Sequence, residues 1–265
     1  MSKVPTATIT THVQRLAAQG VPEGQAPVVV FVHGLLTDSL ASYYFTLGPA
    51  FAAAGVDVIM YDLRGHGRSD RPASGYHVET FVDDLAALLA ALGETRPVHV
   101  VGNSFGGTVA IGLAAWHPEL VATVTMIESE PPTAAWTGHM AEGLADARDR
   151  LADDWAIDWI AERYGAHTAR LSKGANKILR ATTMAEDIPA SRVIDSDLSA
   201  ITCPLLAIFG DESGLAEQVP DFAAKLSHCR SVVLPEQGHS VLVERTDETR
   251  ELILQWVREH ALVAP

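Results

Sequence analysis

The feature that most constrains the fold is a series of short apolar runs separated by turn residues. The runs are VVVFVH, VDVIMY, VHVVG, VATVTMI, LLAIFG and SVVLP, and they occupy residues 28–33, 56–61, 98–102, 121–127, 205–210 and 231–235. Continuous apolar runs of this length are typical of strands that are covered on both faces. The sequence therefore predicts a buried, mostly parallel sheet.

Segments of helical length lie between most of these runs. Apolar residues recur with helical spacing in residues 42–55, 78–93, 107–118, 215–226 and 248–262. Strands that alternate with helices imply right-handed crossovers, so we expect a doubly wound α/β fold. Two extended segments at the start of the chain, TATITTH and VQRLAAQ, predict a hairpin at the edge of the sheet.

One interval interrupts the alternation of strands and helices. Residues 131–200 contain helical patterns and no strand-like run. We interpret them as a helical cap inserted into a core made of residues 1–130 and 201–265. Four aromatic residues of this interval either line a pocket beneath the cap or pack the cap on itself: Trp136, Trp155, Trp159 and Tyr164.

Composition excludes several classes of partner. The chain has 19 basic and 33 acidic residues and a net charge of -14, which disfavours nucleic acid and anionic membranes as partners.

We expect a cytoplasmic protein, because the sequence has neither a signal-peptide pattern nor an apolar run of about 20 residues. Cys203 and Cys229 are interpreted as structural thiols, and no metal-ligand pattern or cofactor motif is present. Whether the chain forms a homodimer is left open.

The segment GNSFG places a serine at a sharp corner. Ser104 stands between the predicted strand 98–102 and the helix that follows, in the pattern G-x-S-x-G. A turn this tight needs Gly102 and Gly106 beside the serine, because larger side chains would collide there. Such a turn exposes the hydroxyl at the carboxyl edge of a sheet, beside the amides that begin a helix. Ser104 is therefore the candidate nucleophile.

A serine nucleophile needs a base within hydrogen-bonding reach. His239 follows the last predicted strand, next to Gly238, in a loop that can fold toward Ser104. We therefore assign His239 as the general base. His33 and His66 stand beside glycines near strand ends, so we expect them to shape loops.

Together these segments resemble the α/β-hydrolase superfamily, in a serine-nucleophile form with a helical cap. The resemblance rests on GNSFG and on three further segments in the family's order, VFVHGLL, MYDLRGHGRSDRP and PEQGHSVLVE, and it spans about residues 28 to 260. It implies the α/β-hydrolase fold. It also implies an oxyanion hole built from the backbone amides of Leu35 and Phe105.

The resemblance leaves the acid of the catalytic triad open. Many relatives carry it three residues after the glycine that ends the seventh strand, and here that position is Ser213. Other relatives carry it at the end of the sixth strand, where this chain has Glu128. We predict Glu128 as the acid, with Asp211 as the alternative and Glu130 as a third candidate.

The expected reaction is acyl transfer. We predict a serine hydrolase that cleaves an ester, thioester or lactone of a hydrophobic small molecule through an acyl-enzyme on Ser104, without cofactor or metal. The alternative is a carbon–carbon bond hydrolase or a cofactor-free lyase or oxygenase that uses the same triad. A third possibility is a sensor that binds a ligand beneath the cap.

Overall fold

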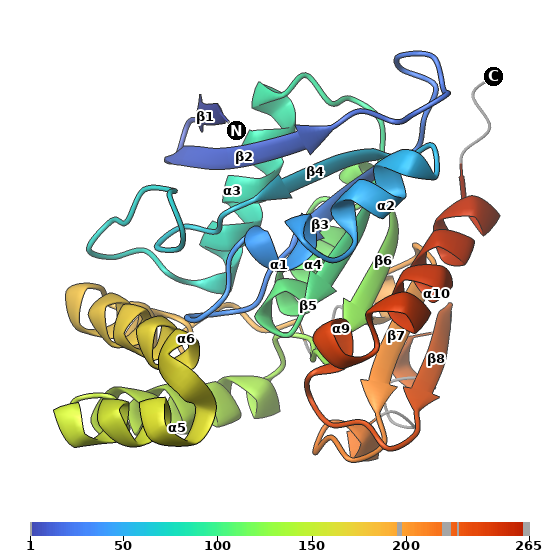
Figure 1. Cartoon of the computed structure of the whole chain (residues 1–265). Coiled ribbons are helices and arrows are strands. Elements are labelled where there is room, and N and C mark those ends of the chain that lie inside the picture. Colours follow the sequence, from blue (N-terminus) through green and yellow to red (C-terminus); the bar gives the residue numbers. More distant parts are fainter. Residues whose placement is uncertain (1, 195–197, 219–223, 227, 262–265) are drawn as a thin grey trace.

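An eight-stranded sheet organises the computed structural model, which describes residues 2–194, 198–218, 224–226 and 228–261 (Figure 1). The strands run in the order β1-β2-β4-β3-β5-β6-β7-β8. Strands β1 and β2 are antiparallel to their neighbours, and the other strands are parallel to one another. The strands are β1 (Ser2–Pro5), β2 (Thr10–Leu16), β3 (Val28–Val32), β4 (Asp57–Tyr61), β5 (Val98–Asn103), β6 (Val121–Ile127), β7 (Leu205–Gly210) and β8 (Cys229–Leu234).

Helices cover both faces of this sheet. The α-helices are α1 (Ala41–Tyr44), α2 (Gly48–Ala53), α3 (Val78–Ala91), α4 (Phe105–Trp116), α5 (Ala134–Arg150), α6 (Asp154–Ala181), α7 (Met184–Asp187), α9 (Val241–Glu244) and α10 (Thr246–Glu259). Short 3-10 turns occur at η1 (Pro118–Leu120), η2 (Leu198–Ala200) and η3 (Ala216–Gln218). The predicted doubly wound α/β architecture is confirmed.

The apolar runs of β3 to β7 are continuous because these strands serve two cores. The run predicted over residues 231–235 differs, because β8 is an edge strand and Val233 is 45% exposed. Along β3, Val28, Val30 and Val32 pack with the core under α3 and α4. Val29 and Phe31 of the same strand face the opposite core, under α2 and α10. All five side chains are buried. Burial of both faces therefore explains why the strand sequences do not alternate with polar residues.

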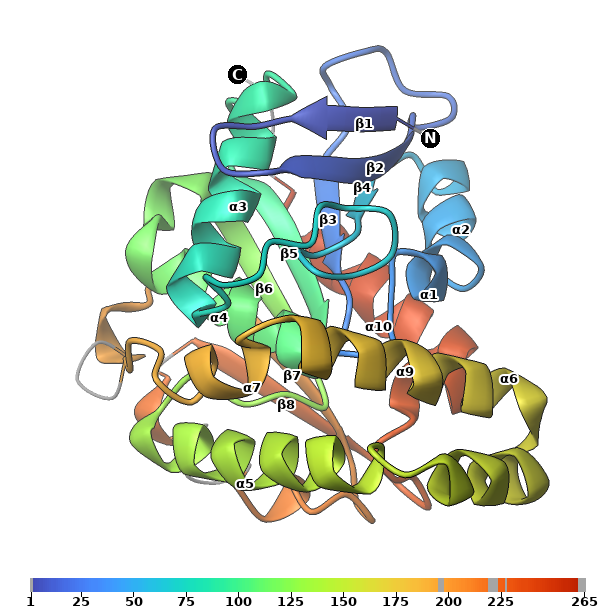
Figure 2. The same cartoon turned by 90° about the vertical axis from the view of Figure 1, so that its left-hand side faces the viewer.

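The chain between β6 and β7 forms a helical layer at one end of the sheet (Figure 2). Helices α5, α6 and α7 pack against one another there, and the described part of this interval contains no strand. Helix α6 bends at Gly165, whose positive φ of 87° is easy only for glycine. The division of the chain into residues 1–130, 131–200 and 201–265 stays a prediction.

Two predicted elements differ from the structure in their bounds. The edge hairpin is present, but it consists of Ser2–Pro5 and Thr10–Leu16 and therefore begins earlier than the pattern indicates. The helix expected over residues 42–55 is two short helices, α1 and α2. Part of the helix expected over residues 215–226 lies outside the described residues.

Candidate active site

Ser104 occupies a strained corner between β5 and α4. Its φ of 51° and ψ of −125° lie in a region that residues with a Cβ rarely adopt. The Ser104 amide donates a hydrogen bond of 2.9 Å to the carbonyl of Ile127. This bond ties the corner to the end of β6, so the strand that Glu128 follows also fixes the position of Ser104.

The two glycines of the corner have no room for a side chain. A Cβ on Gly102 would lie 2.2 Å from the Gly106 carbonyl oxygen, and a Cβ on Gly106 would lie 2.0 Å from the carbonyl oxygen of Val32. Because both obstacles are backbone atoms, side-chain rotation cannot relieve them. The G-x-S-x-G pattern is therefore explained by the close approach of α4 to β5 and β3.

Glu128 and His239 are joined by a hydrogen bond. Nδ1 of His239 lies 3.0 Å from Oε2 of Glu128, whose side chain is fully buried, whereas 58% of the His239 side chain is exposed. A carboxylate can only accept, so Nδ1 carries the proton and Nε2 is left as the basic nitrogen. Glu128 also has a positive φ, of 49°.

Two further donors complete the shell of the Glu128 carboxylate. The Gly210 amide donates to Oε1 at 2.5 Å, and the Ser213 hydroxyl donates to Oε2 at 2.5 Å. Asp211 instead accepts a bond of 3.2 Å from the Gln237 amide. Of the acid candidates, Glu128 is thus the one brought to the histidine.

The role of Ser213 as a hydrogen-bond donor is missed by sequence reasoning. In the sequence, the position three residues after Gly210 is notable only because many relatives have an acid there and this chain has a serine. A hydroxyl there that bonds to an acid on the neighbouring strand cannot be inferred from either segment alone. Gly210 itself is required by packing, because a Cβ there would lie 2.1 Å from the Gln237 carbonyl oxygen.

Two histidines hold the loop that follows β3. The Leu36 amide donates to Nε2 of His66 at 2.8 Å, and Nδ1 of His66 lies 2.8 Å from the Arg64 carbonyl oxygen. His33 accepts from the Leu63 amide through Nε2, at 3.0 Å, and its Nδ1 lies 2.7 Å from the Gly34 carbonyl oxygen. Burial, together with the neighbouring His33, lowers the pKa of His66 to about 3.

These contacts agree with the loop-shaping role expected for both histidines. Leu36, with a φ of 63°, is in the left-handed region. The His66 ring thereby holds the residue directly after Leu35. Within the described part of the chain, the Leu35 and Phe105 amides have no hydrogen-bond acceptor.

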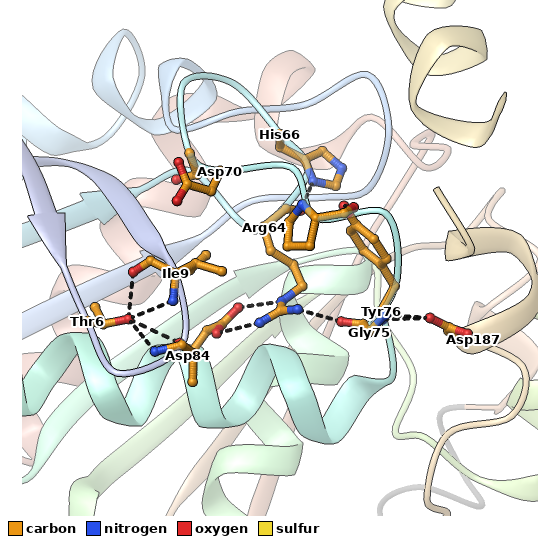
Figure 3. A network of polar contacts seen from close by, with 12 residues as sticks. Thr6, Ile9, Arg64, His66, Asp70, Gly75, Tyr76, Asp84 and Asp187 are labelled. Atoms are coloured by element: carbon orange, nitrogen blue, oxygen red, sulfur yellow. Dashed lines mark hydrogen bonds and ion pairs between the residues drawn. The ribbon is translucent and has the colours of Figure 1, made fainter. Parts of the chain in front are cut away.

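A polar network connects the loop that follows β4, which carries His66, to α3 and to the helical layer (Figure 3). The Arg64 guanidinium makes two hydrogen bonds to Asp84 of α3, at 2.6 and 2.8 Å, and a third of 2.6 Å to the Gly75 carbonyl. Asp187, at the end of α7, accepts from the amides of Gly75 and Tyr76 at 2.9 Å each. The segment that carries His66 is therefore anchored on one side to α3 and on the other to α7.

A cavity of about 460 Å³ opens where these elements meet. Ser104, Glu128, Glu130, Ser213, His239 and the two expected oxyanion residues, Leu35 and Phe105, line it together with Thr108, Ser129, Trp136, Met140, Glu212, Gly214 and Leu215. The catalytic candidates thus share one concave, largely apolar site.

Of the four aromatic residues singled out in residues 131–200, one reaches this cavity. Trp136 is buried in it, with its ring centre 6.2 Å from that of Phe105. Trp155, Trp159 and Tyr164 are exposed and line a second cavity, of about 580 Å³, between α5 and α6. The helical periodicity of residues 131–200 does not indicate which aromatic faces the sheet.

Several other features bear on the chemistry. Burial raises the pKa of the Cys203 thiol to about 11, and neither cysteine lines the cavity. Within the described ranges, His, Cys, Asp and Glu side chains do not form a group of three able to hold a metal ion. No helix in that part of the chain is long and apolar enough to cross a membrane.

Comparisons with known proteins agree with this architecture. The chain is 28% identical over 243 residues to a 2-(acetamidomethylene)succinate hydrolase of Mesorhizobium japonicum, covering 83% of this chain and 84% of the relative. A solved structure described as Est816, an N-acyl homoserine lactone degrading enzyme, superposes with a TM-score of 0.75 at 25% identity, covering 97% of this chain and 100% of that one. The enol-lactonase of Burkholderia xenovorans LB400, at 22% identity, shares the fold with a TM-score of 0.74 and covers 97% of this chain and 100% of its own.

A family model described as the alpha/beta hydrolase fold matches residues 27–246. This match includes Ser104, Glu128 and His239, and it covers most of the sheet. Taken with the named relatives, it shows that the chain belongs to the α/β-hydrolase fold family and is a hydrolase of that family.

Proposed function

We propose that the protein is a serine hydrolase that cleaves an ester, thioester or lactone of a hydrophobic small molecule. The observation that carries this proposal is the 3.0 Å hydrogen bond between His239 and the buried Glu128, in the cavity that Ser104 also lines. A buried carboxylate, a histidine with its basic nitrogen left free and a strained serine are the parts that acyl transfer requires.

The proposed reaction begins with attack of the Ser104 hydroxyl oxygen on the substrate carbonyl carbon. His239 Nε2 takes the hydroxyl proton, and Glu128 stabilises the imidazolium that forms. The negative charge of the tetrahedral intermediate lies on the former carbonyl oxygen, where the Leu35 and Phe105 amides donate to it. The intermediate collapses to the acyl-enzyme when His239 gives its proton to the leaving oxygen or sulfur.

Water then releases the acid product. His239 removes a proton from the water as its oxygen attacks the acyl carbon, and a second tetrahedral intermediate forms on the same two amides. Collapse of that intermediate breaks the bond to Ser104, whose oxygen recovers the proton from His239. The net reaction consumes one water and regenerates the enzyme.

The substrate class is supported by the lining of the cavity and by the relatives. The cavity has an apolar wall suited to an acyl chain, formed by Leu35, Phe105, Trp136, Met140 and Leu215. One relative is named an esterase/perhydrolase, and Est816 is described as degrading N-acyl homoserine lactone. These names favour esters and lactones as substrates.

A fluorophosphonate probe tests the proposal directly. Wild-type protein should be labelled and should hydrolyse 4-nitrophenyl butyrate, and Ser104→Ala should lose both properties. Ser240→Ala is a matched control, because Ser240 lies beside the catalytic histidine but does not line the cavity. Absence of labelling together with absence of ester turnover would contradict the proposal.

The same experiment separates the alternative chemistry. In a carbon–carbon bond hydrolase, lyase or oxygenase on this triad, His239 would act chiefly as a base on the substrate. Ser104→Ala would then slow turnover of 4-nitrophenyl butyrate, whereas His239→Ala, added to the same assay, would abolish it. Loss of activity in both variants supports the acyl-enzyme.

A further inference from the structure

Among the described residues that line the cavity, carboxylates are present and no lysine or arginine balances them. Besides Glu128, which is saturated by its three donors, Glu130 and Glu212 line the cavity, and no ion pair involving either side chain is found within the described residues. None of the described lining residues is a lysine or arginine. All 19 lysines and arginines of the chain fall within the described ranges, so none is hidden elsewhere.

This charge pattern acts against an anionic substrate. A carboxylate on the acyl chain would have to leave water for a cavity that offers it no counter-ion among its described lining residues and two like charges. The net charge of -14 for the whole chain adds to the repulsion at longer range. A cation experiences the opposite force in both respects.

The aromatic lining of the cavity also suits a cation. Trp136 supplies an aromatic surface, and indole rings attract ammonium groups through their electron-rich faces. An indole and two carboxylates thus line the cavity that Ser104 lines.

We propose that the substrate is an ester whose apolar acyl chain ends in a positively charged ammonium group. This inference rests on the proposed serine-hydrolase function and names the substrate class for the same site. The ammonium group would lie near Glu130 and Glu212, and the chain would lie along Trp136 and Met140. The carbonyl carbon would remain at Ser104.

Three 4-nitrophenyl esters of matched shape test this inference. The acyl groups are 6-(trimethylammonio)hexanoyl, its neutral isostere 7,7-dimethyloctanoyl, and 6-carboxyhexanoyl. The last gives the monoester of heptanedioic acid, which is anionic. We expect kcat/KM to fall in that order, with the cationic ester about tenfold above the neutral one, because each carboxylate contributes about threefold. Raising the salt concentration to about 1 M should reduce this preference, since the Debye length then falls to about 3 Å.

Variants assign the preference to the cavity rather than to net charge. In Glu130→Gln/Glu212→Gln the ratio of kcat/KM for the cationic and neutral esters should fall toward one. Glu251→Gln is the control, because it removes the same kind of charge from an exposed position on α10 outside the cavity. Glu212→Lys, at an exposed position, should raise kcat/KM for the anionic ester relative to the neutral one.

The outcomes separate this inference from the function on which it rests. Turnover of all three esters within a factor of about two, or fastest turnover of the anionic ester, would overturn the charge preference and leave the serine hydrolase standing. Equal loss of the ratio in Glu251→Gln would also overturn it, because the effect would then come from net charge. Absence of turnover of every ester, together with absence of phosphonate labelling, would overturn both.

Discussion

Replacing Ser213 with alanine removes one hydroxyl from the carboxylate of the proposed triad and leaves Glu128 in place. In the structure that hydroxyl donates at 2.5 Å to Oε2 of Glu128, the same oxygen that accepts from His239 at 3.0 Å. Ser213 is buried, so water does not readily replace the lost donor. We expect Glu128 to lose part of the restraint that aims it at His239.

The size of the effect follows from the type of bond. A hydrogen bond to a charged group contributes about 1.5–3 kcal/mol. The Gly210 amide still holds Oε1, so part of the orientation of Glu128 survives. If the lower end of this range is expressed in the transition state, where the His239 imidazolium depends on Glu128, kcat falls about tenfold. KM should stay within about twofold, because Ser213 acts on the acid rather than on bound substrate.

The assay is steady-state hydrolysis of a neutral 4-nitrophenyl ester by wild type, Ser213→Ala and Ser213→Thr. Threonine keeps the hydroxyl, so Ser213→Thr should recover most of kcat, whereas a purely structural role would respond to size and not to the donor. Thermal unfolding of each variant shows whether the fold is intact. A folded Ser213→Ala with wild-type kcat would refute the positioning role of Ser213.

Three further outcomes are expected. Glu128→Gln should reduce kcat by about 10³-fold or more in a folded protein, measured on the same ester, because the amide cannot stabilise the imidazolium. Gly106→Ala should abolish folding or lower the free energy of unfolding in urea by more than about 4 kcal/mol, since its Cβ would lie 2.0 Å from the Val32 carbonyl oxygen. Gly138→Ala is the control: a Cβ there has no neighbour within 4 Å, so this variant should be neutral or stabilising. His66 has a folded pKa of about 3, below its ordinary value of 6.5. Its contribution to stability is therefore present above pH 6.5 and is lost as the pH falls toward 3. His66→Gln should reduce the pH dependence of the free energy of unfolding across that window, by up to about 1.4 kcal/mol per pH unit.

The sheet and the serine corner could be predicted because both depend on local sequence. Each buried strand appears as an apolar run, and a strand such as Val28–Val32 contributes side chains to both cores, which removes any alternation. The corner needs glycine at 102 and 106 because a Cβ at either position would lie within 2.2 Å of backbone atoms. Constraints of this kind determine which residue types occur at these positions, so they can be recognised in the sequence.

The layout of helices α5, α6 and α7 could not be predicted, because it depends on long-range packing. The four aromatics of residues 131–200 look alike in sequence, yet Trp136 lies in the cavity with Ser104 while Trp155, Trp159 and Tyr164 line a separate hollow. Which of these aromatics packs against the sheet depends on how α5 crosses the end of the sheet and on the bend of α6 at Gly165. Neither crossing geometry nor interhelical contact has a local sequence signal.

The partner of His239 shows where sequence reasoning reaches its limit. The strand order places β7 between β6, which precedes Glu128, and β8, which precedes His239. The side chain of an acid that follows β6 must therefore extend across the end of β7 to reach His239. Gly210 at that end has no side chain to block it, and the Gly210 amide donates a hydrogen bond to Oε1 of Glu128. Ser213 then fills the space beyond β7 with a short donor instead of a second acid. Glycine at the end of β7, serine three residues later and glutamate after β6 form one arrangement, which becomes visible only when three strands are placed side by side.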